Sequence, residues 1–191
     1  MSEIKAKVNG QTLWTGKVRV NWCHLFEPYK FEGEEKAMYR CDVLIRKDDK
    51  DTLAALAEAI KNAKEAYKGK DNKPFESFVK DGDERVKEDG TPDEPYQGCY
   101  YFATKTDKLP NVRELKEGKV IRCEEEAVYS GCYGQIVIWL FAYIFSGKKG
   151  ISNRLNGFLK TDDGEKLGGE GELSDTELWG QEAEEPAYSF L

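Results

Sequence analysis

Residues 129–159 carry the most continuous hydrophobic pattern in the chain. From Tyr133 to Phe145, two kinds of side chain alternate with the period of two that is typical of a β-strand. One face of this strand is mainly aromatic and holds Tyr133, Gln135, Val137, Trp139, Phe141, Tyr143 and Phe145. The other face is small and aliphatic and holds Cys132, Gly134, Ile136, Ile138, Leu140, Ala142 and Ile144. A helix is the alternative, but the β-branched and aromatic residues between Gly131 and Gly147 favour a long buried strand.

The segment that follows, residues 147–157, predicts a glycine-hinged, exposed loop. It carries Lys148, Lys149 and Arg154 beside the aromatic strand. Cations that contact phosphates next to ring faces that stack on bases are what single-stranded nucleic acid binding requires. The alternative is an ordinary barrel core with a solvated hairpin, and the spacing alone does not decide between the two.

Three shorter segments alternate as half-buried strands do: residues 11–26, 37–47 and 98–106. The polar face of the first carries Lys17 and Arg19, which either line a phosphate groove or are simply solvated. A further short strand is expected over residues 119–129, directly before the long strand.

Between the second and third strands the period changes to that of a helix. Leu53, Leu56, Ile60, Ala63 and Tyr67 recur at steps of three and four residues. Acidic residues at the start of the segment and a glycine just past its end mark the two termini of a core-packing helix.

The order of elements is strand, strand, helix, insertion, strand, short strand and long strand. This order predicts a mainly β fold, an OB-fold-like five-stranded barrel with one main helix, although the OB-fold usually places its helix one strand later. Residues 69–98 are rich in charge, proline and glycine and predict a surface excursion inserted into the barrel.

The net charge of −7 comes from one segment. Residues 169–191 hold seven acidic residues and no lysine or arginine, so residues 1–168 are formally neutral. An acidic chain of this kind is compatible with a nucleic-acid partner, because the charge is segregated rather than spread over the fold. We therefore expect an OB-fold-like domain over residues 1–168, with the 69–98 insertion, followed by a flexible acidic tail.

The candidate DNA contacts combine basic residues for phosphates with aromatic residues for bases. They are Lys17, Arg19, Tyr100, Tyr101, Lys105, Trp139, Tyr143, Lys148, Lys149 and Arg154. Which aromatic rings stack on bases and which pack in the core stays open, because a barrel has an inside and an outside.

The sequence gives little support for a metal, a cofactor or catalysis. The five cysteines are widely spaced and are expected to be buried thiols, without a CxxC pair, and His24 is the only histidine. The consecutive Glu124, Glu125 and Glu126 would alternate across a strand rather than converge on magnesium as a nuclease requires. We expect a protein that is not an enzyme and that lies in the reducing cytoplasm, since no apolar signal segment or membrane span is recognisable.

Several segments together resemble one phage family. They are residues 15–28, 42–65, 81–84, 128–134 (VYSGCYG), 147–156 (GKKGISNRLN) and 163–169 (DGEKLGG). The family is that of phage replication single-stranded DNA-binding proteins, whose fold is similar to the OB-fold protein of short-tailed phages. Lys148, Arg154 and Lys166 depart from the usual family pattern, and each departure adds positive charge.

The resemblance implies a cytoplasmic protein of the infected host cell that coats single strands in phage DNA replication and recombination, with homodimerisation left open. It also implies that the acidic tail competes with DNA and recruits replication proteins such as a polymerase or a helicase-primase. The tail residues expected to contact partners are Trp179, Glu184, Glu185, Tyr188 and Phe190.

Two alternatives remain from the sequence alone. The tail is a solubilising segment without a partner, or the whole chain is an acidic-tail interaction protein or DNA mimic that acts on a host or replication protein. Removal of the tail distinguishes the DNA-binding function from the mimic, because only a DNA-binding body should then bind DNA more tightly.

Overall fold

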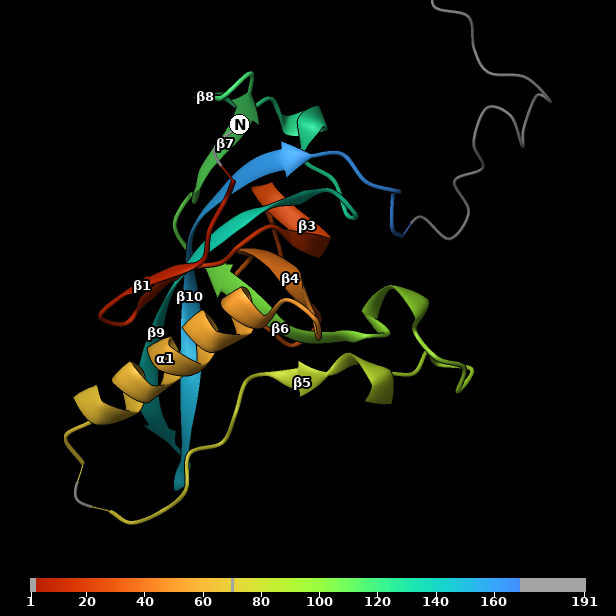
Figure 1. Cartoon of the computed structure of the whole chain (residues 1–191). Coiled ribbons are helices and arrows are strands. Elements are labelled where there is room, and N and C mark those ends of the chain that lie inside the picture. Colours follow the sequence, from red (N-terminus) through yellow and green to blue (C-terminus); the bar gives the residue numbers. More distant parts are fainter. Residues whose placement is uncertain (1–2, 70, 169–191) are drawn as a thin grey trace, which may run out of the picture.

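The computed structural model describes residues 3–69 and 71–168, which form one ten-stranded sheet with a single α-helix, α1 (Lys50–Ala66), packed against it (Figure 1). The strands are β1 (Lys7–Asn9), β2 (Thr12–Trp14), β3 (Val18–Tyr29), β4 (Met38–Arg46), β5 (Lys80–Asp81), β6 (Cys99–Thr106), β7 (Asn111–Lys116), β8 (Lys119–Arg122), β9 (Tyr133–Phe145) and β10 (Lys148–Asp162). Three short 3₁₀ helices lie at Gly82–Glu84, Glu94–Tyr96 and Glu125–Ala127.

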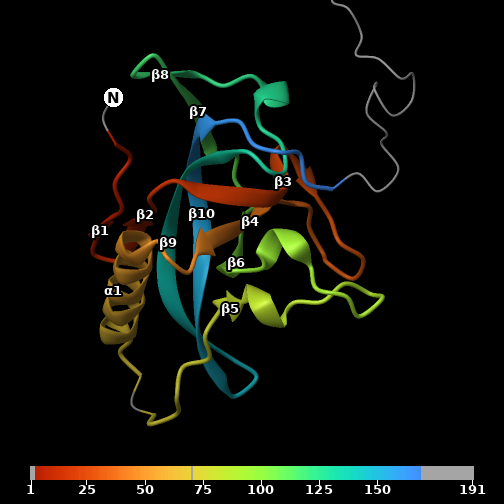
Figure 2. The same cartoon turned by 45° about the vertical axis from the view of Figure 1, so that its right-hand side comes forward.

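The strands are ordered β5-β6-β4-β3-β9-β10-β7-β8, and the β1–β2 hairpin joins through β2 to β9. β10 runs parallel to β7, whereas β9 and β10 form the longest antiparallel pair and extend downward beyond the rest of the sheet (Figures 1 and 2). The sheet curls on itself and brings β10 next to β6. There the Asn153 side chain of β10 donates a 3.1 Å hydrogen bond to the carbonyl of Ala103 in β6. β6 and β10 are therefore neighbours in space although they are not paired in the sheet.

The two faces of β9 separate as their alternation predicts. Ile136, Ile138 and Leu140 are fully buried in the main core, where they join Phe102 of β6 and Leu56 of α1. Each aliphatic side chain buried in this way contributes about 1.5–3 kcal/mol to stability. The aromatic face of β9 points out of the barrel and is half-buried to exposed, so only one face of this strand is core.

The predicted helix and two of the predicted strands are confirmed as α1, β4 and β6. Asp49 caps α1, since its side chain accepts a hydrogen bond from the backbone N–H of Thr52 at 3.1 Å. The apolar stripe of α1 buries Ala55, Ala59 and Ala63.

The prediction of an exposed loop over residues 147–157 is wrong, because these residues lie within the long strand β10. Only Ser146 and Gly147, with positive φ angles of 50° and 75°, make the turn. Gly150 lies inside the strand, where a Cβ would come within 2.8 Å of the Tyr143 hydroxyl. Glycine in a strand here marks the close approach of a neighbouring ring rather than a hinge.

Two other predicted strands have different limits. The pattern over residues 11–26 is interrupted at residues 15–17, so that it forms β2 and β3 rather than one strand. The strand expected over residues 119–129 ends after β8 at Arg122 and gives way to a short 3₁₀ helix. The strand β7 was not expected from the sequence.

The excursion over residues 69–98 docks along its length. Phe78 packs edge-on against Phe102 with ring centroids 5.1 Å apart. The backbone of Glu76 joins β10, since it donates to the carbonyl of Lys149 at 2.8 Å and accepts from the N–H of Ile151 at 3.0 Å. Its later part lies over β6, to the right of the sheet in Figure 1.

The predicted tail, residues 169–191, lies outside the described residues, and so do its candidate partner contacts Trp179, Glu184, Glu185, Tyr188 and Phe190. All five cysteines are free thiols, of which four are buried and Cys23 is half-buried. Within residues 3–69 and 71–168, no helix is long and apolar enough to span a membrane.

Candidate nucleic-acid interface

A row of aromatic side chains lines the outer face of β9. Trp139 and Phe141 are stacked, with ring centroids 5.2 Å apart and an interplanar angle of 25°. Arg154 lies directly opposite Trp139 in the β9–β10 register, and its guanidinium is 5.3 Å from the centre of the indole ring. The pair is a cation stacked on an aromatic surface, the arrangement in which an arginine also stacks well on a base.

The row continues toward the tip of the hairpin. Tyr143 is 36% exposed and lies over Gly150, and Phe145 is 76% exposed at the end of β9. Alternate residues of a strand are about 6.6–6.8 Å apart, so the four rings from Trp139 to Phe145 span about 20 Å. We call the outer faces of β9 and β10 from Trp139 to Arg154 the hairpin face.

The hairpin face carries no negative charge. Residues 127–161 contain four basic residues and no aspartate or glutamate, in a chain with 36 acidic residues. Within the part of the chain that the structure describes, Arg154 makes no ion pair. An unpaired cation beside exposed rings is free to meet a phosphate.

Two features flank the hairpin face. On one side Trp14 of β2 faces outward opposite Val137, with the Lys7 ammonium 4.6 Å from its ring centre. On the other side a shallow groove of about 320 Å³ runs between β9, β10 and β7. Arg113 lines this groove together with Val137 and Leu159. A basic side chain therefore lies on each side of the hairpin, with an aromatic ring beside it on the β2 side.

The two lysines of the hairpin have different environments. The Lys148 side chain is 73% exposed and lies 3.9 Å from Glu76. The Lys149 side chain is only 5% exposed, and its ammonium is 2.9 Å from a carboxylate oxygen of Asp71 and 4.3 Å from the ring centre of Phe75. The hydrogen bond from Lys149, and then that from the Tyr67 hydroxyl, lowers the pKa of Asp71 to about 2. Lys149 fastens the excursion to the hairpin, so the expectation that it is exposed is wrong.

Arg19 and Lys17 hold the end of β10. Arg19 donates to the backbone carbonyls of Gly131 at 3.2 Å and Glu165 at 2.8 Å. Lys17 lies 3.5 Å from Asp162. Both side chains lie at the junction where β3 begins and β10 ends, away from the hairpin tip.

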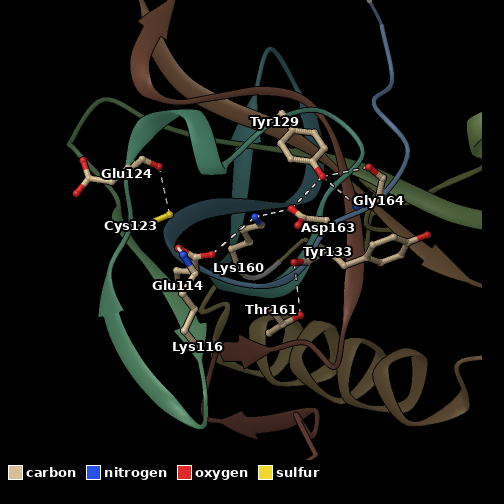
Figure 3. A network of polar contacts seen from close by, with 10 residues as sticks. All are labelled: Glu114, Lys116, Cys123, Glu124, Tyr129, Tyr133, Lys160, Thr161, Asp163 and Gly164. Carbon is tan, nitrogen blue, oxygen red and sulfur yellow. Dashed lines mark hydrogen bonds and ion pairs between the residues drawn. The ribbon is translucent and has the colours of Figure 1, made fainter. Parts of the chain in front are cut away.

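This junction joins the two most specific sequence motifs, residues 128–134 and 163–169. The N–H of Leu167 donates to the carbonyl of Ser130 at 2.7 Å. The Tyr129 hydroxyl lies 3.0 Å from the carboxylate of Asp163, as Figure 3 shows. The described parts of the two motifs therefore form one structural clasp.

A buried lysine lies at the centre of the clasp. Lys160 is 6% exposed, and its ammonium lies 2.6 Å from Asp163 and 3.8 Å from Glu114 (Figure 3). Although burial lowers the pKa of Lys160, the hydrogen bond and charge of Asp163 raise it above its ordinary value. Lys160 is thus a structural cation that holds β10 to β7 and to the segment after it.

Tyr101 and Tyr100 lie on opposite faces of β6. Tyr101 is 9% exposed and packs edge-on against Tyr96 of the excursion, with ring centroids 4.8 Å apart. Tyr100 is half-buried on the core side, 5.1 Å below the ammonium of Lys47. Neither ring is open to a base in this conformation.

Lys105 lies on the outer face of β6, farther along the strand. Its side chain is 54% exposed and 3.5 Å from Glu34. Lys105 follows two residues after Ala103, whose backbone carbonyl accepts a hydrogen bond from Asn153, so it lies on a strand next to β10.

A polar network fixes the excursion to the sheet. The hydroxyl of Tyr96, a fully buried residue, donates to Asp42 at 2.6 Å and accepts from Asn21 at 3.2 Å. Burial raises the pKa of the Asp42 carboxyl above its ordinary value, although the hydrogen bond from Tyr96 opposes this shift. Arg85 covers the Tyr96 ring at 4.1 Å and pairs with Asp93 at 2.8 Å.

The structure brings together four of the predicted contacts, Trp139, Tyr143, Lys148 and Arg154, on one hairpin. The other predicted contacts are held at the clasp, under the excursion or beside Glu34; they are Lys17, Arg19, Tyr100, Tyr101, Lys105 and Lys149. Four neighbouring residues were missed: Phe141, Phe145, Trp14 and Lys7. Phe141 and Phe145 lie in a run without acidic residues, 127–161, which could have indicated them from the sequence. Trp14 and Lys7 reach the hairpin only through the pairing of β2 with β9, which no sequence pattern predicts.

Comparisons with known proteins identify the family and the fold of the chain. A family model described as the ssDNA-binding protein of Enterobacter phage Enc34 matches residues 11–187. No curated protein sequence matches the chain.

Solved structures of two phage proteins share the fold. The single-stranded DNA-binding protein from bacteriophage Enc34 in complex with ssDNA is 24% identical, with a TM-score of 0.68, 87% of this chain covered and 99% of that chain. A second structure of the single-stranded DNA-binding protein from bacteriophage Enc34 is 22% identical, with a TM-score of 0.66, 94% of this chain covered and 99% of that chain. Gp2.5, a single-stranded DNA-binding protein encoded by bacteriophage T7, is 15% identical, with a TM-score of 0.56, 96% of this chain covered and 98% of that chain. These likenesses confirm the predicted mainly β, OB-fold-like fold.

Proposed function

The chain belongs to the family of the Enterobacter phage Enc34 ssDNA-binding protein, and from that premise we propose that it binds single-stranded DNA on the hairpin face. The single observation that carries this proposal is the row of outward rings on β9 with Arg154, which has no ion pair among residues 3–69 and 71–168, stacked on Trp139. An aromatic surface of this length, whose own residues include no carboxylate, attracts both parts of a single strand, its bases and its phosphates.

Single strands are favoured over duplexes for a geometric reason. A ring can stack on a base only where the face of the base is open, and in a duplex neighbouring base pairs cover that face. Because every base has such a face, binding is tolerant of sequence. Arg154 and Lys148 supply charge for the phosphates, which also makes binding sensitive to salt.

We propose a binding protein rather than an enzyme. Burial raises the pKa of the thiols of Cys41 and Cys132 above the ordinary value, which makes them poor nucleophiles. Burial, and then the charge of Arg40, lowers the pKa of His24, which lies outside the hairpin face. No cofactor enters this function.

The acidic tail has two roles in this proposal. Its seven carboxylates, tethered to the domain at high effective concentration, compete with DNA for the basic surface. Its aromatic residues Trp179, Tyr188 and Phe190 anchor partners, as aromatic side chains commonly do at protein interfaces. The partners are phage replication proteins such as a polymerase or a helicase-primase, in the host cytoplasm during DNA replication and recombination.

A titration with labelled oligo-dT and with a duplex of equal length, each at low and high salt, tests the proposed function. We expect tighter binding of the single strand and a fall in affinity with salt of about 0.7 log units per log unit of salt for each phosphate contact. Equal affinity for both forms of DNA would contradict stacking, and a flat salt dependence would remove the phosphate contacts.

The tail is tested with a variant that ends at Gly168. Its affinity for oligo-dT should exceed that of the full chain, most of all at low salt, because the internal competitor is gone. Unchanged affinity at low salt would leave the tail as a solubilising segment. Loss of all DNA binding by the shortened chain would contradict the location on the hairpin face.

A further inference from the structure

The carboxylate of Glu34, in the turn between β3 and β4, is held by three donors. Nη2 of Arg40 lies 2.5 Å from its Oε2, and the backbone N–H of Phe31 donates to the same oxygen at 3.0 Å. Nζ of Lys105 lies 3.5 Å from its Oε1. These hydrogen bonds, first the one from Arg40 and then the one from Phe31, lower the pKa of Glu34 to about 2. A guanidinium, an ammonium and a backbone N–H around one anion are also the donors that bind a phosphate.

Arg40 has capacity for a further acceptor. The residue is 9% exposed, and its Nε has no hydrogen-bond partner among the described residues. A buried guanidinium N–H without a partner lowers the stability of the fold. Glu34 accepts from Nη2 of Arg40 and leaves Nε without an acceptor. An acceptor with more oxygens than a carboxylate, or one placed between Nε and Nη2, would satisfy both donors.

Aromatic rings surround this group of donors. Phe31 lies over the guanidinium of Arg40 with its ring centre 4.5 Å away, and Tyr29 packs edge-on against Phe31 at 5.1 Å. Tyr29 and Phe31 are 44% and 43% exposed, and Tyr29 stacks on His24 at 4.6 Å. Exposed rings directly beside anion donors are the combination that a nucleotide requires.

The site can be reached from the hairpin face. Lys105 is two residues beyond Ala103 on the outer face of β6, and Ala103 is exposed and contacts β10 through Asn153. A strand that leaves the hairpin face across Ala103 therefore meets Lys105 first and Arg40 behind it.

We propose that Glu34 occupies, as an internal anion, a phosphate site formed by Arg40, Lys105 and the N–H of Phe31, and that a phosphate of single-stranded DNA displaces it. The inference rests on the proposed function and adds a gate to it. Glu34 follows Gly33, whose φ of +85° and open surroundings allow the turn to change without moving a strand. While Glu34 is in place it offsets one of the two positive charges of the site, which weakens capture of a strand that touches the hairpin face alone.

Glu34→Gln tests the gate, because glutamine keeps the shape of the side chain and removes its charge. We expect the affinity for labelled oligo-dT at low salt to rise about three- to tenfold, the scale of one partly exposed charge-assisted contact. The salt dependence should steepen by about one phosphate contact, a change of about 0.7 in slope.

Glu35→Gln is the matched control, since Glu35 is exposed, adjacent in sequence and makes no hydrogen bond or ion pair within the described chain. It removes the same charge without opening the site, so we expect an effect below twofold. An equal rise in both variants would overturn the gate and leave only a general charge effect.

The gain should also depend on the donors. In a Lys105→Ala background, Glu34→Gln should raise affinity by less than half as much as in the wild-type chain, because one ligand of the phosphate is gone. A gain that is unchanged by Lys105→Ala would contradict the site. Thermal unfolding of each variant separates a loss of fold from a loss of binding. If the wild-type chain binds no oligo-dT, the proposed function itself fails; wild-type binding with equal effects of Glu34→Gln and Glu35→Gln overturns the gate alone.

Discussion

The hairpin face and the outer face of β3, β4 and β6 both combine aromatic rings with basic side chains, but they use them differently. On the second face the structure gives each central cation a carboxylate: Arg85 has Asp93, and Arg40 has Glu34. On the hairpin face Arg154 lies against the Trp139 ring and makes no ion pair within the described residues. Cations that a carboxylate neutralises either hold the fold together or must first be released, as we propose for Arg40, whereas those without one can bind DNA directly.

The largest expected effect is on stability and belongs to the covered face. Tyr96→Ala removes a fully buried ring that holds the excursion, so the free energy of unfolding should fall by about 3–5 kcal/mol. Urea unfolding measures this change. Tyr96→Phe is the control and should cost about 1–3 kcal/mol, because it leaves the Asp42 carboxylate without its donor. A cost below 1 kcal/mol for the alanine variant would mean that the excursion is not anchored there.

The next effect is on binding and belongs to the hairpin face. Trp139→Ala should lower the affinity for oligo-dT by about 5- to 150-fold, because loss of one stacked base costs about 1–3 kcal/mol. Anisotropy titration gives the affinity, and urea unfolding should show a smaller loss of stability than Tyr96→Ala, since the indole lies on the outside of the barrel. The reverse outcome, a large loss of stability with unchanged affinity, would make Trp139 a packing residue.

Two adjacent lysines sharpen the comparison within one hairpin. Lys149→Ala should destabilise the chain by about 1–3 kcal/mol, because it leaves the carboxylate of Asp71 without its main donor. Lys148→Ala should change stability by less than about 0.5 kcal/mol and should weaken binding at low salt. Parallel urea and oligo-dT titrations measure both quantities, and identical behaviour of the two variants would erase the distinction between covered and open cations.

The smallest effects are on pH dependence and have opposite signs. The pKa of Asp71 in the folded state is lowered to about 2. Its contribution to stability is therefore fully present above the ordinary aspartate pKa of about 4 and is lost as the pH falls toward 2. The pKa of Asp42 in the folded state is raised. Its contribution to stability is therefore fully present below the ordinary aspartate pKa and is lost as the pH rises through the raised pKa.

Urea unfolding between pH 2 and 6 of Asp71→Asn and Asp42→Asn, each against the wild-type chain, tests these signs. Asp71→Asn should flatten the loss of stability in acid, and Asp42→Asn should steepen it. Shifts of the same sign in the two variants would contradict the environments of these carboxylates.

The sequence predicted the elements whose periodicity is strong and local. The alternation from Tyr133 to Phe145 predicts a strand with two different faces, and the period of three and four residues predicts the helix α1; both elements are present. Residues 147–157 were misread because glycine indicates a hinge in isolation but a close approach inside a sheet. Which face of β9 lies outside depends on the closure of the barrel, which is a tertiary property.

The candidate site was partly predictable for the same reason. Composition identified rings and cations, but it could not show that Lys149 would meet Asp71, 78 residues away in the chain, or that the excursion would cover Tyr101. The Glu34 site was missed because its three donors come from β4, β6 and a turn, and no sequence spacing links them.

Emission from Trp139 tests the central claim most directly. The chain has four tryptophans, and Trp14→Phe, Trp22→Phe and Trp179→Phe together leave Trp139 as the sole emitter. If bases stack on the hairpin face, titration with oligo-dT quenches this emission in a saturable way, in step with anisotropy of the labelled DNA, and salt reverses both signals. Anisotropy that reports binding while the Trp139 emission stays unchanged would contradict the account and place the DNA on another face of the barrel.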